Sequence, residues 1–173
     1  MPFRLLRQVY FTLIHCYLNY CVEAWGTAYN STLHPIIVLQ KRAIRIMTFS
    51  HFIAHTKELF EITDILPLNK LVFYNICQMV YKELNGLSVS NFGFSFSKTH
   101  NISTRNASKL KISHHKTNYY CQSITHCGIK FYNILPDDIV NSCSFHIFKH
   151  KLLEWIKLSH LELDRLIYPH RYV

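Results

Sequence analysis

The chain has 173 residues, 49% of them hydrophobic and 14% aromatic, which excludes wholesale disorder and suffices for one domain with a core or a small domain with an extension. A formal net charge of +9 favours polyanionic partners, with nucleic acid first and an anionic membrane surface second. With only four glycines a phosphate-cradling glycine loop is disfavoured, and no apolar run approaches the roughly 18–20 residues of a membrane span.

Residues 3–23 are predicted to form the first helix, because large apolar side chains recur there at helical spacing. Gly26 is expected to end this segment. A short polar link, residues 27–32, leads to a second helix, and helices joined by so short a link are expected to pack antiparallel. The apolar stripe of the first helix comprises Leu6, Val9, Tyr10, Leu13, Tyr17 and Tyr20.

The second predicted helix, residues 33–47, has Thr32 as its expected N-cap and Pro35 in its first turn. At helical spacing its apolar residues gather on one side and three cations gather on the other. This cationic patch either lies in solvent or contacts phosphates. The apolar side comprises Leu33, Ile36, Ile37, Leu39, Ala43, Ile44, Ile46 and Met47, and the cationic side comprises Lys41, Arg42 and Arg45.

Two further helices complete the first half of the chain. Residues 56–62 are predicted to form a short helix capped by Thr56. Pro67 then opens a helix over residues 68–84, which Asn85-Gly86 ends. Residues 1–86 are therefore predicted to be an all-α domain.

The composition changes after this point, because no acidic residue lies between Glu83 and Asp137. Residues 87–122 are predicted to be a basic segment of loops with short strands near residues 110–112 and 119–122. Cations interleaved with aromatic rings can hold a phosphate backbone and stack on bases, and the alternative is a solvated basic loop. The candidate phosphate-binding cations of this segment are Arg105, Lys109 and Lys111.

Residues 123–173 are predicted to be helical, with helices over residues 123–134 and from the N-cap Ser144 to about residue 160. Adjacent aspartates hold metal ions in polymerases, but Asp137 and Asp138 follow a proline, a context typical of a helix start. The predicted fold is mainly α.

The cysteines and histidines suggest no catalytic or metal site. Cys121, His126 and Cys127 do not have the spacing of a compact zinc ligand pair. The six cysteines are expected to be reduced thiols of an intracellular protein, in the nucleus or the cytoplasm.

Three clusters of residues together resemble the C-terminal part of reverse transcriptases from non-LTR retrotransposons of the jockey-like LINE type. Each cluster alone is a weak motif, and their order and spacing carry the resemblance. The family usually has Trp where Tyr132 stands. The clusters are Tyr20 to Trp25-Gly26 followed by Leu39-Gln40-Lys41-Arg42-Ala43-Ile44-Arg45, then Asn101-Ile-Ser-Thr104-Arg105, and finally Tyr132-Asn133-Ile-Leu135-Pro136 followed by Ser144-Phe145-His-Ile-Phe148-Lys149.

The resemblance implies that residues 1–86 correspond to the polymerase thumb, a helical unit that grips the RNA/DNA template–primer duplex. The fingers, the palm with its metal-binding aspartates, and the endonuclease would lie upstream of Met1. The chain is then expected to be a C-terminal fragment that binds nucleic acid without polymerising. Any Mg²⁺ would belong to the palm, so no cofactor, catalytic residue or metal ligand is expected in this chain.

The expected nucleic-acid-binding residues are Lys41, Arg42, Arg45, Arg105, Lys109 and Lys111. Two alternatives remain open. The chain could be a non-catalytic helical domain that binds a protein, including the rest of a reverse transcriptase, or a decayed remnant of such an element.

Overall fold

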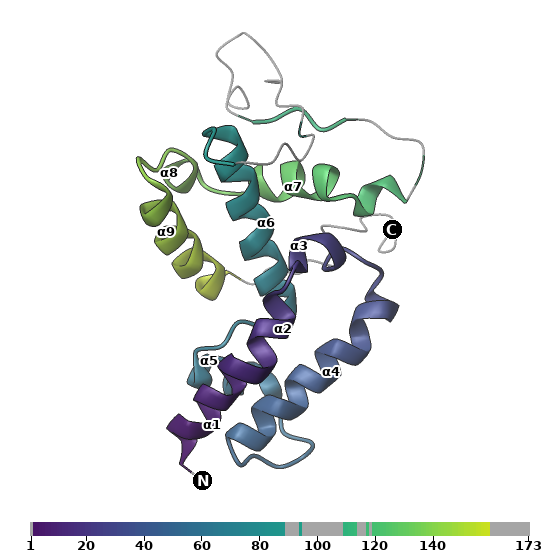
Figure 1. Cartoon of the computed structure of the whole chain (residues 1–173), viewed down its shortest axis with the longest axis vertical. Helices are drawn as coiled ribbons and strands as arrows, with labels where there is room; N and C mark the ends of the chain where they lie inside the picture. Colours follow the sequence, from purple (N-terminus) through teal and green to yellow (C-terminus); the bar gives the residue numbers. More distant parts are fainter. Residues whose placement is uncertain (1, 89–93, 95–108, 114–116, 118, 160–173) are drawn as a thin grey trace. The chain divides into compact units, whose positions relative to one another are not determined.

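A computed structural model describes residues 2–88, 94, 109–113, 117 and 119–159 of the chain. This part of the chain is mainly α-helical, which confirms the predicted fold class (Figure 1). The chain consists of two compact units, which comprise residues 1–72 and residues 73–173. Among the helices described, none is both long enough and apolar enough to cross a membrane.

The first predicted helix is a continuous run of three segments, α1 (Phe3–Val9), the π-helical η1 (Tyr10–His15) and α2 (Cys16–Asn19). It ends earlier than predicted, because Cys21 adopts a left-handed conformation with φ 48°. A separate short helix, α3 (Val22–Trp25), follows this break.

The π-helical segment also changes which face of this helix is buried. Leu6, Tyr10, Ile14 and Leu18 are the residues that turn inward, and they recur every four positions. In a regular α-helix each four-residue step overshoots a full turn by about 40°. The wider π turn absorbs this drift. Leu13, Tyr17 and Tyr20, which were predicted to belong to the apolar core stripe, are instead exposed.

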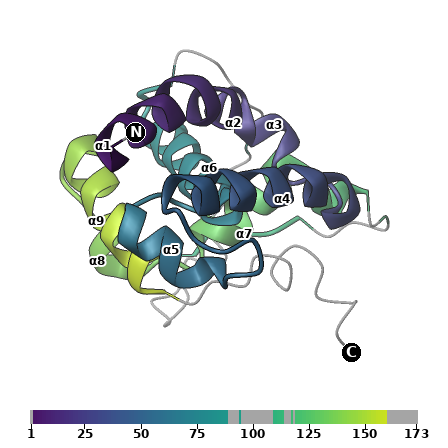
Figure 2. The same cartoon turned by 90° about the horizontal axis from the view of Figure 1, so that it is seen from below.

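Helix α4 (Asn30–Met47) begins three residues before its predicted start. Thr32 therefore lies inside the helix and is not its N-cap, a position that Tyr29 occupies without a capping side-chain bond. Pro35 lies beyond the first turn. The helix runs back antiparallel to α1, as expected, and it contacts both α1 and α5 (Thr56–Thr63) (Figures 1 and 2).

The core of the first unit lies between these helices and consists of Tyr10, Ile44, Met47, Phe60 and Ile65. Helix α5 matches its predicted position, except that His55 and not Thr56 precedes its first residue. The next helix, α6 (Leu68–Leu84), has its predicted bounds. Residues 68–72 of α6 belong to the first unit and its remainder to the second.

A buried glutamine joins three segments of the first unit. The Gln40 side chain is 2% exposed, and its Nε2 donates to Tyr10 Oη and to the Leu66 carbonyl, each at 3.0 Å. Its Oε1 accepts a 2.9 Å bond from the backbone N–H of Leu68, the first residue of α6. Gln40 thus caps α6 from another helix, because a first-turn N–H has no partner within its own helix.

Close packing explains the glycine at the end of α3. A Cβ on Gly26 would stand 2.5 Å from the Val22 carbonyl oxygen and 2.5 Å from Val72 Cγ2. Its φ of −70° is ordinary, so space and not backbone freedom requires glycine here. The adjacent Trp25 donates its indole N–H to the Tyr20 carbonyl at 3.0 Å, which holds α3 against the break that precedes it.

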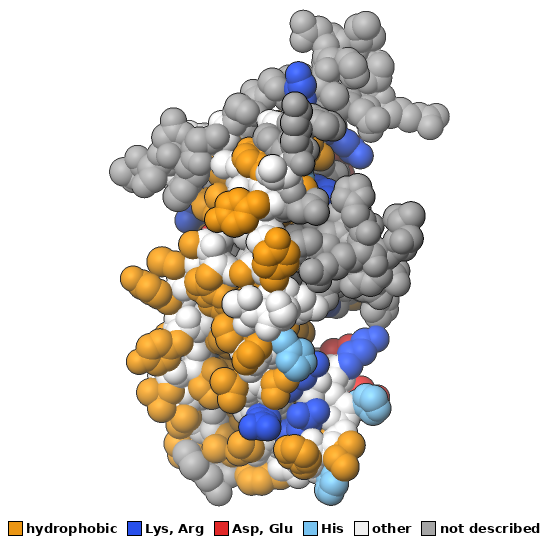
Figure 3. All heavy atoms as spheres, turned by 90° about the vertical axis from the view of Figure 1, so that its right-hand side faces the viewer, with side chains coloured by type: hydrophobic (Ala, Val, Ile, Leu, Met, Phe, Trp, Pro, Cys, Tyr) orange, Lys and Arg blue, Asp and Glu red, His pale blue; other side chains and the backbone are white. Residues whose placement is uncertain are grey.

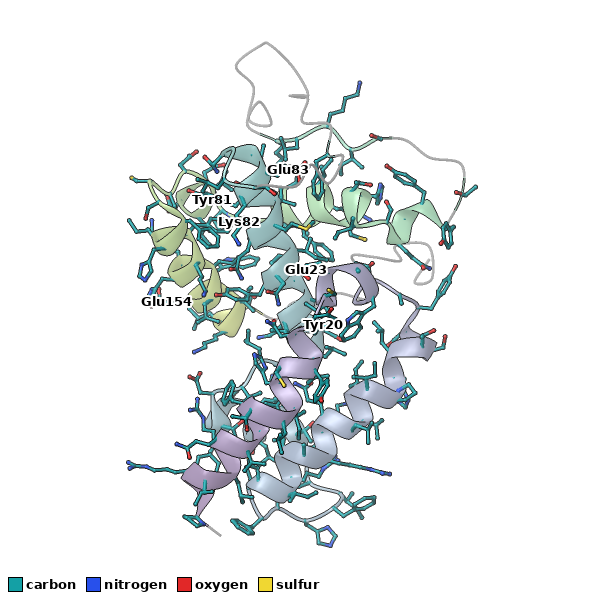
Figure 4. The ribbon with its side chains drawn as sticks, in the orientation of Figure 1. Tyr20, Glu23, Tyr81, Lys82, Glu83 and Glu154 are labelled. Carbon is teal, nitrogen blue, oxygen red and sulfur yellow. The ribbon has the colours of Figure 1, made fainter. Side chains whose placement is uncertain are left out.

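The second unit is built from the rest of α6, the 3₁₀-helix η2 (Tyr120–Gln122), α7 (Ile124–Tyr132), α8 (Asp137–Val140) and α9 (Phe145–Leu158). Tyr81 stacks on Phe148 at a ring-centroid distance of 4.1 Å and donates to the Ser142 carbonyl at 2.9 Å. Lys82 lies over the Phe145 ring. Figure 4 shows both α6 side chains on the side of the helix that faces α8 and α9.

The predicted helix starts of this unit are confirmed. Ser123 accepts a hydrogen bond from the His126 N–H, and Ser144 accepts one from the Ile147 N–H. Asp137 and Asp138 lie in the first turn of α8. A side-chain oxygen or a negative charge at these places offsets the unpaired N–H groups and the helix dipole.

The two predicted strands are not formed. Residues 120–122 are a 3₁₀ turn, and around residues 110–112 only Leu110 makes a β-type bridge. The side-chain amide of Asn133, the residue after α7, also bonds the backbone of Leu110. It accepts from the Leu110 N–H at 2.9 Å and donates to the Leu110 carbonyl at 2.8 Å.

Candidate nucleic-acid interface

Helix α4 buries one face and presents the other to solvent. Its buried residues are Leu33, Gln40, Ile44 and Met47. Leu39 and Ile46 were predicted to lie on the core face, and this is wrong, because they are 62% and 69% exposed. The polar Gln40 holds the centre of the buried face, so the helix is rotated relative to the prediction.

The three predicted cations of α4 differ in their surroundings. Arg42 is exposed and Lys41 is half-buried, and neither side chain makes a hydrogen bond or an ion pair within the part of the chain that the structure describes. Arg45 is half-buried, and its Nε donates to the Ala54 carbonyl at 3.0 Å. Lys41 and Arg42 are therefore available to a ligand, whereas Arg45 makes a hydrogen bond within the fold.

The solvent face of α4 is not purely cationic, contrary to the prediction. Leu39, Arg42 and Ile46 follow one another at helical spacing, and the two apolar members are 62% and 69% exposed. Figure 3 shows Lys and Arg side chains beside hydrophobic ones near the C-terminal end of α4. This mixed row can contact both an anionic backbone and an apolar or aromatic group.

The loop of residues 48–55 follows α4 and begins in an unusual way. Phe49 has φ 53°, its N–H donates to the Ile46 carbonyl, and the Ser50 N–H donates to the Arg45 carbonyl at 3.0 Å. This pair of bonds is the Schellman motif, in which the left-handed position usually holds glycine. Here it holds a phenylalanine whose ring is 71% exposed.

The loop carries two more large apolar side chains at its surface. Phe52 is 69% exposed and Ile53 is 76% exposed. In the sequence, no acidic residue lies between Glu23 and Glu58, a stretch that contains Lys41, Arg42, Arg45 and Lys57. Along the chain the apolar loop lies between Arg45 and Lys57, and Glu58 follows directly after Lys57 in the first turn of α5.

A second group of predicted cations lies in the second unit. Lys109 and Lys111 are exposed on either side of Leu110, which Asn133 holds against the end of α7. Arg105 lies outside the described residues. The structure thus places two of these three cations next to each other on an anchored segment of backbone.

The acidic residues of the described part form no metal site. Asp137 and Asp138 are exposed at the start of α8, and nowhere in residues 2–88, 94, 109–113, 117 and 119–159 do three or more His, Cys, Asp or Glu side chains gather to hold a metal ion. Their position at a helix start agrees with the predicted structural role.

The cysteines near η2 have the chemistry of packed thiols. Burial raises the pKa of Cys127 to about 12, and its Sγ donates to the Cys121 carbonyl at 2.9 Å. Burial also raises the pKa of Cys77 well above its ordinary value. Neutral thiols are poor nucleophiles and poor metal ligands. All six cysteines are free.

Sequence reasoning missed Gln40, Phe49 and Phe52 as residues of interest. Gln40 stands in the middle of an otherwise apolar face, and that position was the available signal. Phe52 and Ile53 form a short apolar group between two helices, and Phe49 gives no sequence signal because its backbone conformation is unexpected for phenylalanine.

No protein-family model matches the chain, and neither a curated protein nor a solved structure matches it. What this surface can bind therefore follows from its own residues.

Proposed function

We propose that the chain binds the RNA/DNA template–primer duplex through the solvent face of α4, as the C-terminal part of a non-LTR retrotransposon reverse transcriptase. The observation that carries the proposal is the pair Lys41 and Arg42, two cations without an internal partner among the described residues, on a helix whose opposite face is locked into a core. Contacts to backbone phosphates need fixed cations and no sequence readout.

Two further features support the proposal. The chain carries a formal net charge of +9, which favours association with a polyanion. Lys109 and Lys111 offer a second cationic point, exposed and flanking an anchored residue. The three motif clusters that resemble the reverse transcriptases connect these physical properties to a template–primer duplex and not to another polyanion.

The test is the salt dependence of binding to a blunt RNA–DNA duplex. Replacing Lys41→Gln and Arg42→Gln together is expected to weaken binding and to lower the slope of log affinity against log salt by about 2, because each phosphate contact contributes about 0.9 to that slope. The matched control removes two exposed cations elsewhere, Arg4→Gln and Lys149→Gln. An unchanged slope in the first pair, or an equal decrease in both pairs, overturns the proposal.

A protein-interaction domain is the second candidate, and one observation favours it. Leu13, Tyr17 and Tyr20 on the first helical run are 62%, 77% and 76% exposed. Exposed apolar side chains that gather on one surface often mark a protein contact. Sedimentation separates the candidates, because self-association without duplex binding favours the second and a monomer that binds duplex favours the first.

A further inference from the structure

Three helices of the chain end in the same backbone motif. Helices α4, α5 and α6 all end in a left-handed residue, with φ 53° at Phe49, 54° at Asp64 and 65° at Gly86. After each of these residues, the next N–H bonds back to a carbonyl five positions earlier. Glycine and aspartate tolerate this conformation, whereas phenylalanine has no local means of offsetting the steric conflict.

The strained position holds a phenyl ring that is largely exposed. Phe49 is 71% exposed, and within the described part of the chain its ring makes no contact with another ring or a cation. A polar residue with a left-handed preference would end the helix equally well. Because strained backbone conformations persist chiefly at functional positions, the exposed ring calls for a functional explanation.

The loop that carries the ring is fixed at both ends by a single arginine. The Arg45 carbonyl accepts from the Ser50 N–H at 3.0 Å, and the Arg45 Nε donates to the Ala54 carbonyl at 3.0 Å. Thr48 and Ser50 also share a hydroxyl bond of 2.8 Å. Residues 49–53 are thereby held in place before any ligand binds, which lowers the entropy lost on binding.

The surface formed by Phe49, Phe52 and Ile53 lies directly after the cationic helix face. Phe49 stands two residues after the end of α4, and no acidic residue occurs from residue 24 to residue 57. Charge complementarity therefore selects an anionic ligand, and two open phenyl rings select one with flat π surfaces. Single-stranded nucleic acid has both properties.

We propose that the loop of residues 48–55 is a stacking platform on which Phe49 and Phe52 hold unpaired bases of a strand whose phosphates contact Lys41 and Arg42. This inference rests on the proposed function, because the same two cations hold the duplex. It adds a distinct ligand, the single-stranded extension that leaves the duplex. Stacking on phenyl rings is tolerant of base identity, so the platform serves any sequence.

The test compares a blunt RNA–DNA duplex with the same duplex bearing a single-stranded oligo(dT) tail, and includes the free tail strand. The wild-type protein is expected to bind the tailed duplex about tenfold more tightly than the blunt one, because stacking contributes roughly 1–3 kcal/mol per base. The double variant Phe49→Leu with Phe52→Leu keeps apolar side chains and removes both π surfaces. It is expected to lose the gain from the tail and to bind the blunt duplex like the wild type.

The matched control is Tyr17→Leu with Tyr20→Leu, which removes two aromatic rings of similar exposure from the same unit and is expected to keep the gain. No gain in the wild-type protein, or a gain that survives in the Phe49→Leu and Phe52→Leu variant, overturns the inference. If the Phe49→Leu and Phe52→Leu variant loses the gain while the Lys41→Gln and Arg42→Gln variant keeps the wild-type salt slope, the proposed duplex grip and the phosphate contacts of Lys41 and Arg42 are both overturned. Only the stacking of bases on Phe49 and Phe52 then remains.

A membrane surface is the competing ligand, and vesicles of phosphatidylserine and phosphatidylcholine test for it. Binding to a lipid surface scales with buried apolar area and with attraction to anionic lipids, and leucine side chains retain most of that apolar area. Vesicle binding that persists with leucine at both positions, combined with no gain from the tail, overturns the inference in favour of a membrane contact.

Discussion

Gln40 illustrates how one polar residue in a core determines the packing around it. Its amide bonds Tyr10, Leu66 and Leu68, and every one of these bonds connects α4 to another segment. A buried donor or acceptor that loses its partner costs more than the bond itself contributed. Gln40 therefore stabilises the fold mainly by pairing the Leu66 carbonyl and the Leu68 N–H, which would otherwise have no partner.

Replacing Gln40→Leu is expected to lower the free energy of unfolding by about 2–4 kcal/mol, because the Leu68 N–H and the Leu66 carbonyl lose their partners away from water. Urea unfolding measures the change. The control Gln8→Leu alters an exposed glutamine and is expected to change stability by less than about 0.5 kcal/mol. Equal effects of the two substitutions would contradict the role assigned to Gln40.

His15 is a half-buried titratable side chain of the first unit. Its Nδ1 is buried and has no hydrogen-bond partner among the described residues, and its ring packs against Phe11 at a centroid distance of 5.1 Å. Desolvation by burial lowers its pKa below the ordinary value of 6.5. Below pH 6.5 the unfolded chain therefore binds more protons at this position than the folded chain does.

The free energy of unfolding of the wild-type protein is accordingly expected to fall as the pH decreases from 6.5 towards the lowered pKa of His15. The variant His15→Phe lacks this titration and is expected to lose less stability over the same range. Chemical denaturation at a series of pH values measures both curves. Parallel curves for the two proteins would contradict the prediction.

The ends of the helices show which structural features a sequence can predict. Gly86 ends α6 as expected, and Ser123 and Ser144 cap their helices. These residues have local preferences that act in any context. Phe49 ends α4 by the same motif without such a preference, so that the exposed loop after α4 could not be foreseen.

Substituting Phe49→Asn is expected to raise the free energy of unfolding by about 1 kcal/mol, because asparagine tolerates the left-handed conformation. Gly86→Ala, at the equivalent position of α6, is expected to lower it by about 1 kcal/mol. Thermal unfolding measures both. The control Ile62→Asn removes an apolar side chain of 72% exposure from α5 and is not expected to be stabilising. Destabilisation by Phe49→Asn would show that the ring supports the fold.

Strand formation and the rotation of a helix about its axis are features that the sequence did not predict correctly. Residues 110–112 have strand-like composition, but only Leu110 makes a β-type bridge, and the side chain of Asn133, just after α7, bonds both backbone groups of Leu110. Leu39 and Ile46 are apolar, yet the rotation of α4 is set by its bonds to other segments. Both errors have the same cause, since each outcome depends on contacts between residues far apart in the sequence.

For the molecule as a whole, composition and periodicity predicted the mainly helical fold and the approximate positions of most helices. The candidate site was predicted only in part. Lys41 and Arg42 were expected at the surface from their spacing, and their role in binding stays a prediction. The hydrogen bond of Arg45 to the Ala54 carbonyl and the exposed apolar residues of α4 were not expected. The number of cations can be counted in a sequence. Whether a cation is free to bind a ligand depends on whether the folded chain places a carbonyl acceptor, such as that of Ala54, within reach of its side chain.

The π-helical segment Tyr10–His15 has a consequence for how the length of this chain can vary. A π turn accommodates more residues than an α turn over the same stretch of helix. Loss of one residue between Tyr10 and His15 would convert this segment to regular α-helix. The change would be confined to a segment that already departs from α-helical geometry. An equivalent deletion inside α4 would rotate Gln40 away from its three partners. Natural variants that differ in length by one residue are therefore expected in the first segment and not in α4.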